Sequence, residues 1–97
     1  MTPTKVDRTK ITKLTDLPNV GPATAGDLKL LGFRHPEDLR GQDPYAMYDR
    51  LCRITNVRHD SCVIDVFISV THFINGGKAK PWWDFTEQRK RTLAKLT

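Results

Sequence analysis

The sequence gives little indication of structural disulfides, of a membrane span or of a secretory signal. It holds two cysteines, Cys52 and Cys62, and small secreted domains that depend on disulfides usually hold more. The longest apolar stretch, residues 62–73, is interrupted by polar residues that include Asp65, Ser69 and His72, and it is shorter than the roughly 18 residues of a membrane span. The first 15 residues are polar and basic, without the apolar core of a secretory signal. We therefore expect a cytoplasmic protein whose thiols are reduced.

The sequence also does not predict β-strands, because it has no long alternation of apolar and polar residues. The 97 residues suffice for one domain. Helix start and stop signals predict an all-α fold of about five helices in a compact, SAM-like arrangement. The expected helical segments are 7–15, 22–31, a short turn over 35–39, 44 to about 54, 60 or 61 to about 75, and 84 onward.

A few residues are expected to set the ends and faces of these helices. Asp43 and Asp60 suit N-cap positions, and Asp84 with Glu87 resembles a capping box for a basic last helix. An apolar stripe that ends at Ile54 should pack the preceding helix into the core. The helix from 60 or 61 is apolar around most of its circumference, so we expect it at the centre of the fold.

Positive charge is concentrated toward the two ends of the chain. The formal net charge is +5, with an isoelectric point near 9.5, and basic residues outnumber acidic ones in residues 5–13 and 78–95. We divide the chain into a basic N-terminal segment, residues 1–13, and a single helical domain, residues 14–97. This charge suits a polyanionic partner such as DNA, and it equally suits a solvated surface that keeps a protein soluble.

The stretch Leu-Pro-Asn-Val-Gly-Pro-Ala-Thr, residues 17–24, predicts a tight hairpin that leads into a helix. Asn19 tolerates a positive φ, and Gly21 leaves the backbone open to close approach. The first helical turn then presents the N–H groups of Ala23 and Thr24 beside small side chains. Such a turn carries partial positive charge and is suited to binding an anion.

This stretch resembles the helix-hairpin-helix motif, a DNA-binding hairpin of repair and recombination proteins. The resemblance implies that the N–H groups of Gly21, Ala23 and Thr24 contact DNA phosphates without reading base sequence. Two positions depart from the motif: Asn19 stands at its first glycine, and Ala23 stands where it usually has lysine or arginine. The second departure removes a phosphate contact. Two interpretations therefore stay open, namely DNA-backbone binding and a protein-protein interaction or dimerisation module that has lost DNA binding.

A weaker echo of this pattern follows at residues 54–61. Asn56 of this segment falls on Asn19 of the first hairpin, and helices flank both segments. Such hairpins often work in pairs, one for each DNA strand, so the resemblance implies a second, degenerate hairpin here. In it Arg58 and His59 replace Gly-Pro and would face phosphates as cations, with His59 charged at lower pH.

Three longer stretches extend the resemblance to much of the chain: LPNVGPATAGDLKLLGF, DPYAMYDRLCRITNVRHDSCVIDVF and KPWWDFTEQRK. Across residues 14–91 the chain is similar to a bacterial family of small proteins named after a pathogenicity locus, many of which are called mitomycin-resistance proteins. It is more distantly similar to the C-terminal domain of bacterial competence regulators. Neither resemblance implies an established activity. Mitomycin damages DNA, which would fit a DNA-repair role.

Other residue patterns suggest chemistry, and each has a simpler explanation. Asp65, Ser69 and His72 share one helix stripe, but it spans about 10 Å, too far for a nucleophile and its base, so we expect a solvated or subunit-facing stripe. The cysteines and histidines lack zinc-ligand spacing. One or both of Trp82 and Trp83 are expected to anchor the last helix by burial rather than to stack on bases. We expect no enzyme activity, metal or cofactor.

Overall fold

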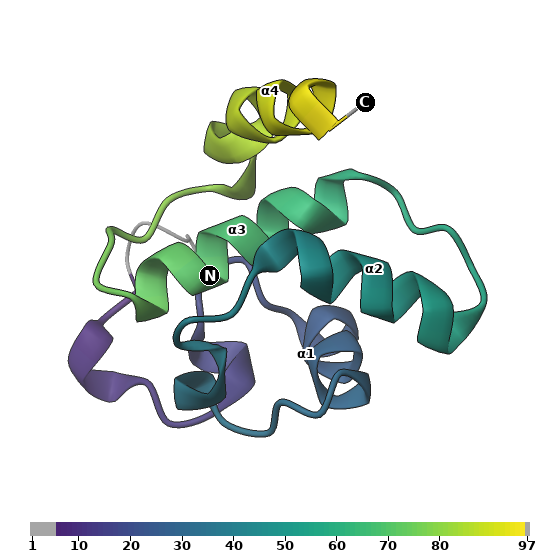
Figure 1. Ribbon diagram of the computed structural model, residues 1–97. Coiled ribbons are helices and arrows are strands. Elements are labelled where there is room, and N and C mark those ends of the chain that lie inside the picture. Colours follow the sequence, from purple (N-terminus) through teal and green to yellow (C-terminus); the bar gives the residue numbers. More distant parts are fainter. Residues whose placement is uncertain (1–5, 97) are drawn as a thin grey trace.

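The computed structural model describes residues 6–96, and within them the fold is built of helices and turns without strands (Figure 1). The predicted all-α class is therefore confirmed. The α-helices are α1 (Pro22–Leu30), α2 (Pro44–Thr55), α3 (Cys62–Ile74) and α4 (Thr86–Leu96). Short 3-10 turns complete the described chain: η2 (Arg8–Lys10), η3 (Leu14–Asp16), η4 (Pro36–Leu39) and η5 (Trp82–Phe85).

Helix α3 is the centre of the fold, as its apolar sequence predicts. Helices α1 and α2 lie on one side of it and α4 on the other (Figure 1). The main core fills the first side and is built around residues such as Leu17, Leu28, Leu51, Phe67 and Val70. A smaller cluster of Ile64, Ile68 and Phe85 fills the second side. None of the helices in residues 6–96 is long and apolar enough to span a bilayer.

Local capping signals place several helix ends where the sequence predicts them. The Asp43 carboxylate accepts a hydrogen bond from the N–H of Tyr45 at 2.9 Å and caps α2. Asp60, one residue before the N-cap Ser61, accepts one from the N–H of Cys62 at 3.0 Å and so satisfies the first N–H group of α3. Gly32 follows α1 with a φ of 95°, the left-handed conformation that ends helices without a Cβ clash.

Two expected helix boundaries are wrong, for reasons that lie in side-chain hydrogen bonds. Residues 7–15 form 3-10 turns rather than one helix, because the Asp16 carboxylate takes the N–H groups of Thr12 and Lys13 at 3.1 Å each and so competes with helical bonding. Asp84 does not cap the last helix. It lies inside η5, and α4 begins at Thr86, whose hydroxyl bonds to α3.

The predicted apolar stripe of α2 is correct except at its end. Leu51 is buried, but the Ile54 side chain is 51% exposed. In the last turn Thr55 faces inward instead, since its hydroxyl donates to the carbonyl of Leu51 at 2.8 Å. This half-buried position cannot be deduced from helical spacing alone, which places residues 54 and 55 almost equally well under residue 51.

In the polar stripe of α3, Asp65 and Ser69 are buried and His72 is half-buried, so the expectation of a solvated or subunit-facing stripe is wrong for the first two. Each member holds a different part of the chain. Asp65, which has no exposed side-chain surface, pairs with Arg89 of α4 at 2.9 Å. Ser69 accepts a hydrogen bond from Asn19 of the first hairpin at 3.0 Å. The His72 ring packs edge-on against Phe85, with centroids 5.4 Å apart. These are structural contacts that join α3 to its neighbours.

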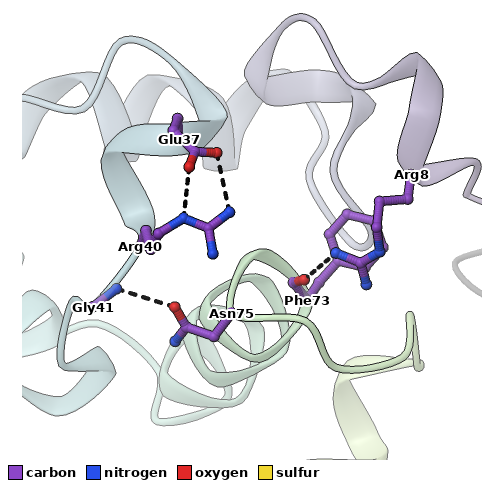
Figure 2. A network of polar contacts seen from close by, with 6 residues as sticks. All are labelled: Arg8, Glu37, Arg40, Gly41, Phe73 and Asn75. Carbon is purple, nitrogen blue, oxygen red and sulfur yellow. Dashed lines mark hydrogen bonds and ion pairs between the residues drawn. The ribbon is translucent and has the colours of Figure 1, made fainter.

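Residues 6–13 of the predicted basic segment pack against the end of α3, while residues 1–5 lie outside the described chain. Val6 and Ile11 contact the main core. The Arg8 guanidinium lies over the Phe73 ring, 4.1 Å from its centroid, and donates to the Phe73 carbonyl at 2.6 Å (Figure 2). It also donates to the Gly77 carbonyl. The positive charge of Arg8 therefore stabilises the C-terminus of α3.

Candidate functional site

The hairpin before α1 is rigidly held by the core. Leu17 and Val20 are buried, and Pro18 is fully enclosed. Asn19 turns the chain with a φ of 66°, as its ability to adopt the left-handed region predicts. A tight turn fixed in this way presents the residues that follow it in one orientation.

The N-terminus of α1 carries no capping side chain. Gly21 is its N-cap, and the first intrahelical bond runs from the N–H of Ala25 to the Gly21 carbonyl at 2.9 Å. The N–H groups of Ala23 and Thr24 have no recorded acceptor among the described residues. The carboxylates of Asp43 and Asp60 accept N–H groups in the first turns of α2 and α3, whereas Gly21 supplies no side chain to α1. Partial positive charge is thus left open to an anion.

Nothing within residues 6–96 requires a glycine at position 21. Its φ is −94°, which any residue adopts, and a Cβ built on it meets no atom within 4 Å. Gly21, Pro22 and Ala23 are all exposed. These small residues therefore leave the backbone of the turn uncovered, and a partner could approach it closely.

The side chain of Asn19 points into the structure rather than toward a ligand. Its Nδ2 donates to the Ser69 hydroxyl at 3.0 Å and to the Lys80 carbonyl at 2.8 Å. Both hydrogens of the amide are used in this way. Asn19 therefore shapes the predicted site and ties it to α3 and to the loop before η5.

The second predicted hairpin shares the turn of the first but not its packing. Asn56 has a φ of 54° and matches Asn19. Ile54 and Val57, however, are 51% and 55% exposed, whereas their counterparts in the first hairpin are buried. The Asp60 carboxylate already occupies the N-terminus of α3, and its bonds to Cys62 hold the pKa of Asp60 below its usual value. An anion at this helix end would meet a negative charge.

Arg58 and His59 occupy different environments in this second hairpin. The Arg58 side chain is exposed. His59 is half-buried, and its ring Nε2 lies 2.9 Å from the Thr55 hydroxyl. The backbone carbonyl of His59 accepts a hydrogen bond from the Tyr48 hydroxyl. Any phosphate contact here would therefore rest on the Arg58 side chain, and a role for His59 in DNA binding stays a prediction.

Two basic side chains and a histidine lie at the far end of α1. Lys29, Arg34 and His35 line a depression of about 550 Å³, and no ion pair involves their side chains in residues 6–96. Lys29 is six residues beyond Ala23, or about 9 Å along the helix axis. From the sequence, Lys29 and Arg34 are candidate replacements for the missing cation at Ala23 that are not expected to restore its contact, and their grouping with His35 cannot be deduced because the turn at Gly32 separates them.

A second hollow, of about 420 Å³, lies between residues 8–12, η4 and the end of α3. Figure 2 shows its charged groups: Arg8 lies over the Phe73 ring, and Glu37 and Arg40 face each other. The shortest distance in that ion pair is 2.5 Å, and the guanidinium keeps the pKa of Glu37 below its usual value. Glu37 neutralises Arg40, and the Arg8 guanidinium is engaged by the carbonyls of Phe73 and Gly77, so the cations of this hollow already have partners within the chain.

The tryptophans do not both anchor the last helix. Phe85 is buried between α3 and α4, whereas Trp83 is 58% exposed and Trp82 is half-buried. Of the two tryptophans expected to anchor the helix, Trp83 does not do so, and Trp82 is partly buried. Phe85 and the Asp65–Arg89 pair hold α4 in place instead.

Both cysteines are free and half-buried. Burial, followed by the nearby Asp60 carboxylate, raises the pKa of the Cys62 thiol. A raised pKa lowers the thiolate fraction at neutral pH and with it nucleophilic reactivity. No group of three or more potential metal ligands occurs in residues 6–96.

Comparisons with known proteins agree over most of the chain. Residues 7–91 match the family described as "Cdd1: Pathogenicity locus". The chain is also similar to a protein of Streptomyces lavendulae named "Mitomycin resistance protein McrB". The two are 37% identical over 81 residues, which make up 84% of this chain and 77% of that protein. No solved structure matches the chain significantly.

Proposed function

The chain belongs to the pathogenicity-locus family, as its sequence predicts, and we propose that it binds the phosphate backbone of DNA through the hairpin before α1. The observation that carries the proposal is the uncapped start of this helix. There the N–H groups of Ala23 and Thr24 lie open beside Gly21, on a turn fixed by the core. A phosphate oxygen is an acceptor that matches such donors.

The surrounding charges support the same proposal. Lys29 and Arg34 line one depression beyond the hairpin, and we infer that a strand running along α1 meets them. They would offset the missing cation at Ala23. Backbone donors and flexible cations contact phosphates of any sequence, so the expected binding is weak, independent of base sequence and strongly dependent on salt.

This function is binding without catalysis, in the cytoplasm. The name of the Streptomyces lavendulae relative refers to mitomycin resistance, and we place the DNA contact proposed here in repair or protection of DNA. The distant similarity to competence regulators stays a prediction.

Fluorescence anisotropy with a labelled duplex tests the proposal at low and at physiological salt. Gly21→Glu places a carboxylate where the phosphate should lie. The change should not unfold the protein, because the new side chain meets open space and a negative charge stabilises a helix N-terminus. Ala46→Glu is the matched control, since it makes the same charge change at an exposed position of α2.

We expect Gly21→Glu to weaken duplex binding at least tenfold and Ala46→Glu to change it less than twofold, because only the first change blocks the proposed contact. Equal loss in both variants would show that net charge alone drives binding. Absence of binding by the unmodified protein at low salt would refute the proposal.

A second candidate function is an interaction module for protein partners. The exposed Ile54 and Val57 favour it, because they place apolar surface beside the second hairpin. A second copy of this chain would make the surface a dimer interface. Sedimentation velocity over a range of concentrations tests this candidate, and Val57→Asp should abolish any self-association. Unlike phosphate binding, an apolar contact should not weaken as salt rises.

A further inference from the structure

We propose that residues 78–83 continue the binding surface beyond the hairpin and that the Trp83 indole stacks on an unpaired nucleobase. This inference rests on the proposed phosphate contact at Gly21, and it specifies the form of DNA: a single strand, or a duplex with an unpaired end. The observations that carry it are the position of the segment, its rigid support, the exposure of Trp83 and the surrounding charge.

The segment lies directly beside the hairpin. Asn19, two residues before Gly21, donates a hydrogen bond to the Lys80 carbonyl at 2.8 Å. Trp83 follows three residues later, so its backbone lies within about 11 Å of that contact. A strand held at the hairpin would therefore need only a few further nucleotides to reach the indole.

The indole is presented on rigid support. Pro81 precedes the turn, and Phe85 is buried at its end. The Trp82 and Trp83 rings meet edge to face, with centroids 5.6 Å apart and an interplanar angle of 83°. A side chain fixed in this way loses little conformational freedom when a ligand stacks on it.

Trp83 is not needed to close the core. It is 58% exposed, while Trp82 is half-buried and Phe85 packs into the cluster between α3 and α4. A large aromatic side chain left in water is costly in apolar exposure. Its open face can stack on any base, because every base has a π-face.

The charge around Trp83 favours a nucleic acid over a protein partner. Lys78 and Lys80 are exposed, and neither forms an ion pair in residues 6–96. The Lys80 ammonium lies 5.9 Å from the Phe85 ring centroid. Asp84 is a neighbouring carboxylate that opposes them. Lysines are depleted at the cores of protein interfaces, whereas lysines interleaved with an aromatic residue are typical of surfaces that bind single strands.

Intrinsic fluorescence tests the stacking directly, because Trp82 and Trp83 are the chain's two tryptophans. Trp82→Phe leaves Trp83 as the reporter, and Trp83→Phe leaves Trp82. Titration with a twelve-residue oligothymidylate should quench the emission of the first variant and leave that of the second nearly unchanged. Quenching confined to the variant that retains Trp82 would overturn the proposal.

Affinity provides the second measurement. Trp83→Ala should weaken binding of the single strand roughly 5- to 100-fold, the range expected for one lost stack, and should change duplex binding less than twofold. Its thermal unfolding should match that of the unmodified protein, because the side chain is largely exposed. Equal effects on both DNA forms, or none on either, would overturn the inference.

Gly21→Glu separates this inference from the proposed function. It should weaken both DNA forms, whereas Trp83→Ala weakens the single strand alone. If Gly21→Glu acts and Trp83→Ala does not, the hairpin contact stands and the stacking fails. If the unmodified protein binds neither DNA form, both fail. Loss of self-association in Trp83→Ala, without an effect on DNA, would assign the indole to a protein interface.

Discussion

Removal of the Arg89 guanidinium tests whether a buried ion pair holds α4 to α3. The side chain of Asp65 is 0% exposed and that of Arg89 is 13% exposed. Two hydrogen bonds join them, from Nε to Oδ1 at 2.9 Å and from Nη2 to Oδ2 at 3.3 Å. Thr86 donates a third to the same carboxylate at 2.7 Å. Arg89→Met keeps an aliphatic stem and leaves this carboxylate without its cation.

The expected loss is large because the charge that remains is buried. Removal of one partner from a buried pair costs about 3–5 kcal/mol, and the free energy of unfolding of a domain this size is roughly 5–15 kcal/mol. Urea unfolding followed by circular dichroism should show Arg89→Met with a much lower midpoint. Arg91→Met, an exposed position on the same helix, should stay within about 0.5 kcal/mol.

The double variant Asp65→Leu/Arg89→Met provides the internal check. Replacement of both partners by apolar side chains is often neutral, so the double variant should recover much of the stability that Arg89→Met loses. The reasoning is refuted if Arg89→Met costs less than about 1 kcal/mol, or if the double variant is less stable than Arg89→Met.

Two further predictions concern local backbone and capping. Gly26→Ala should raise the free energy of unfolding by about 0.5–1 kcal/mol, because Gly26 is exposed within α1 and a Cβ there meets open space. Gly32→Ala should lower it by about 1 kcal/mol, since its φ is 95°; urea midpoints that move in the same direction would contradict this. Asp60→Asn tests the cap of α3: because the N–H of Cys62 lowers the pKa of Asp60 in the folded state, the stability that the carboxylate adds is present at neutral pH and is lost as pH falls through that lowered value. The difference between the unmodified protein and Asp60→Asn should therefore shrink below about pH 4, and a constant difference would exclude the mechanism.

The helix boundaries that the sequence predicts correctly depend on neighbouring residues. Asp43 and Asp60 cap helices that begin within two residues of them, and Gly32 ends the helix just before it. The wrong expectations depend on distant contacts. Ile54 fits a helical stripe, but tertiary packing leaves it exposed. The sequence shows Asp65 only as a polar residue in an apolar helix, because its partner, Arg89, lies 24 residues further along the chain.

In the candidate site, too, the features set by neighbouring residues are predictable and those set by distant contacts are not. The turn at Asn19 and the open start of α1 follow from local residue types, and both are found. The direction of the Asn19 side chain is set by Ser69 and Lys80, which are 50 and 61 residues away. The exposure of Trp83 likewise depends on Phe85 filling the space between α3 and α4. No periodicity in the sequence distinguishes those two aromatic residues.

The contacts of α3 also bear on how the chain folds during synthesis, which proceeds from the N-terminus. Arg8 is made 65 residues before Phe73, and Asp65 is made 24 residues before Arg89. In that interval α3 carries an ionised carboxylate with no partner, and burial of such a group is unfavourable. The central helix is therefore kept partly in water until α4 has emerged from the ribosome. We therefore expect the Asp65 carboxylate, which holds α4 to α3 in the complete fold, to delay burial of α3 while the chain is incomplete.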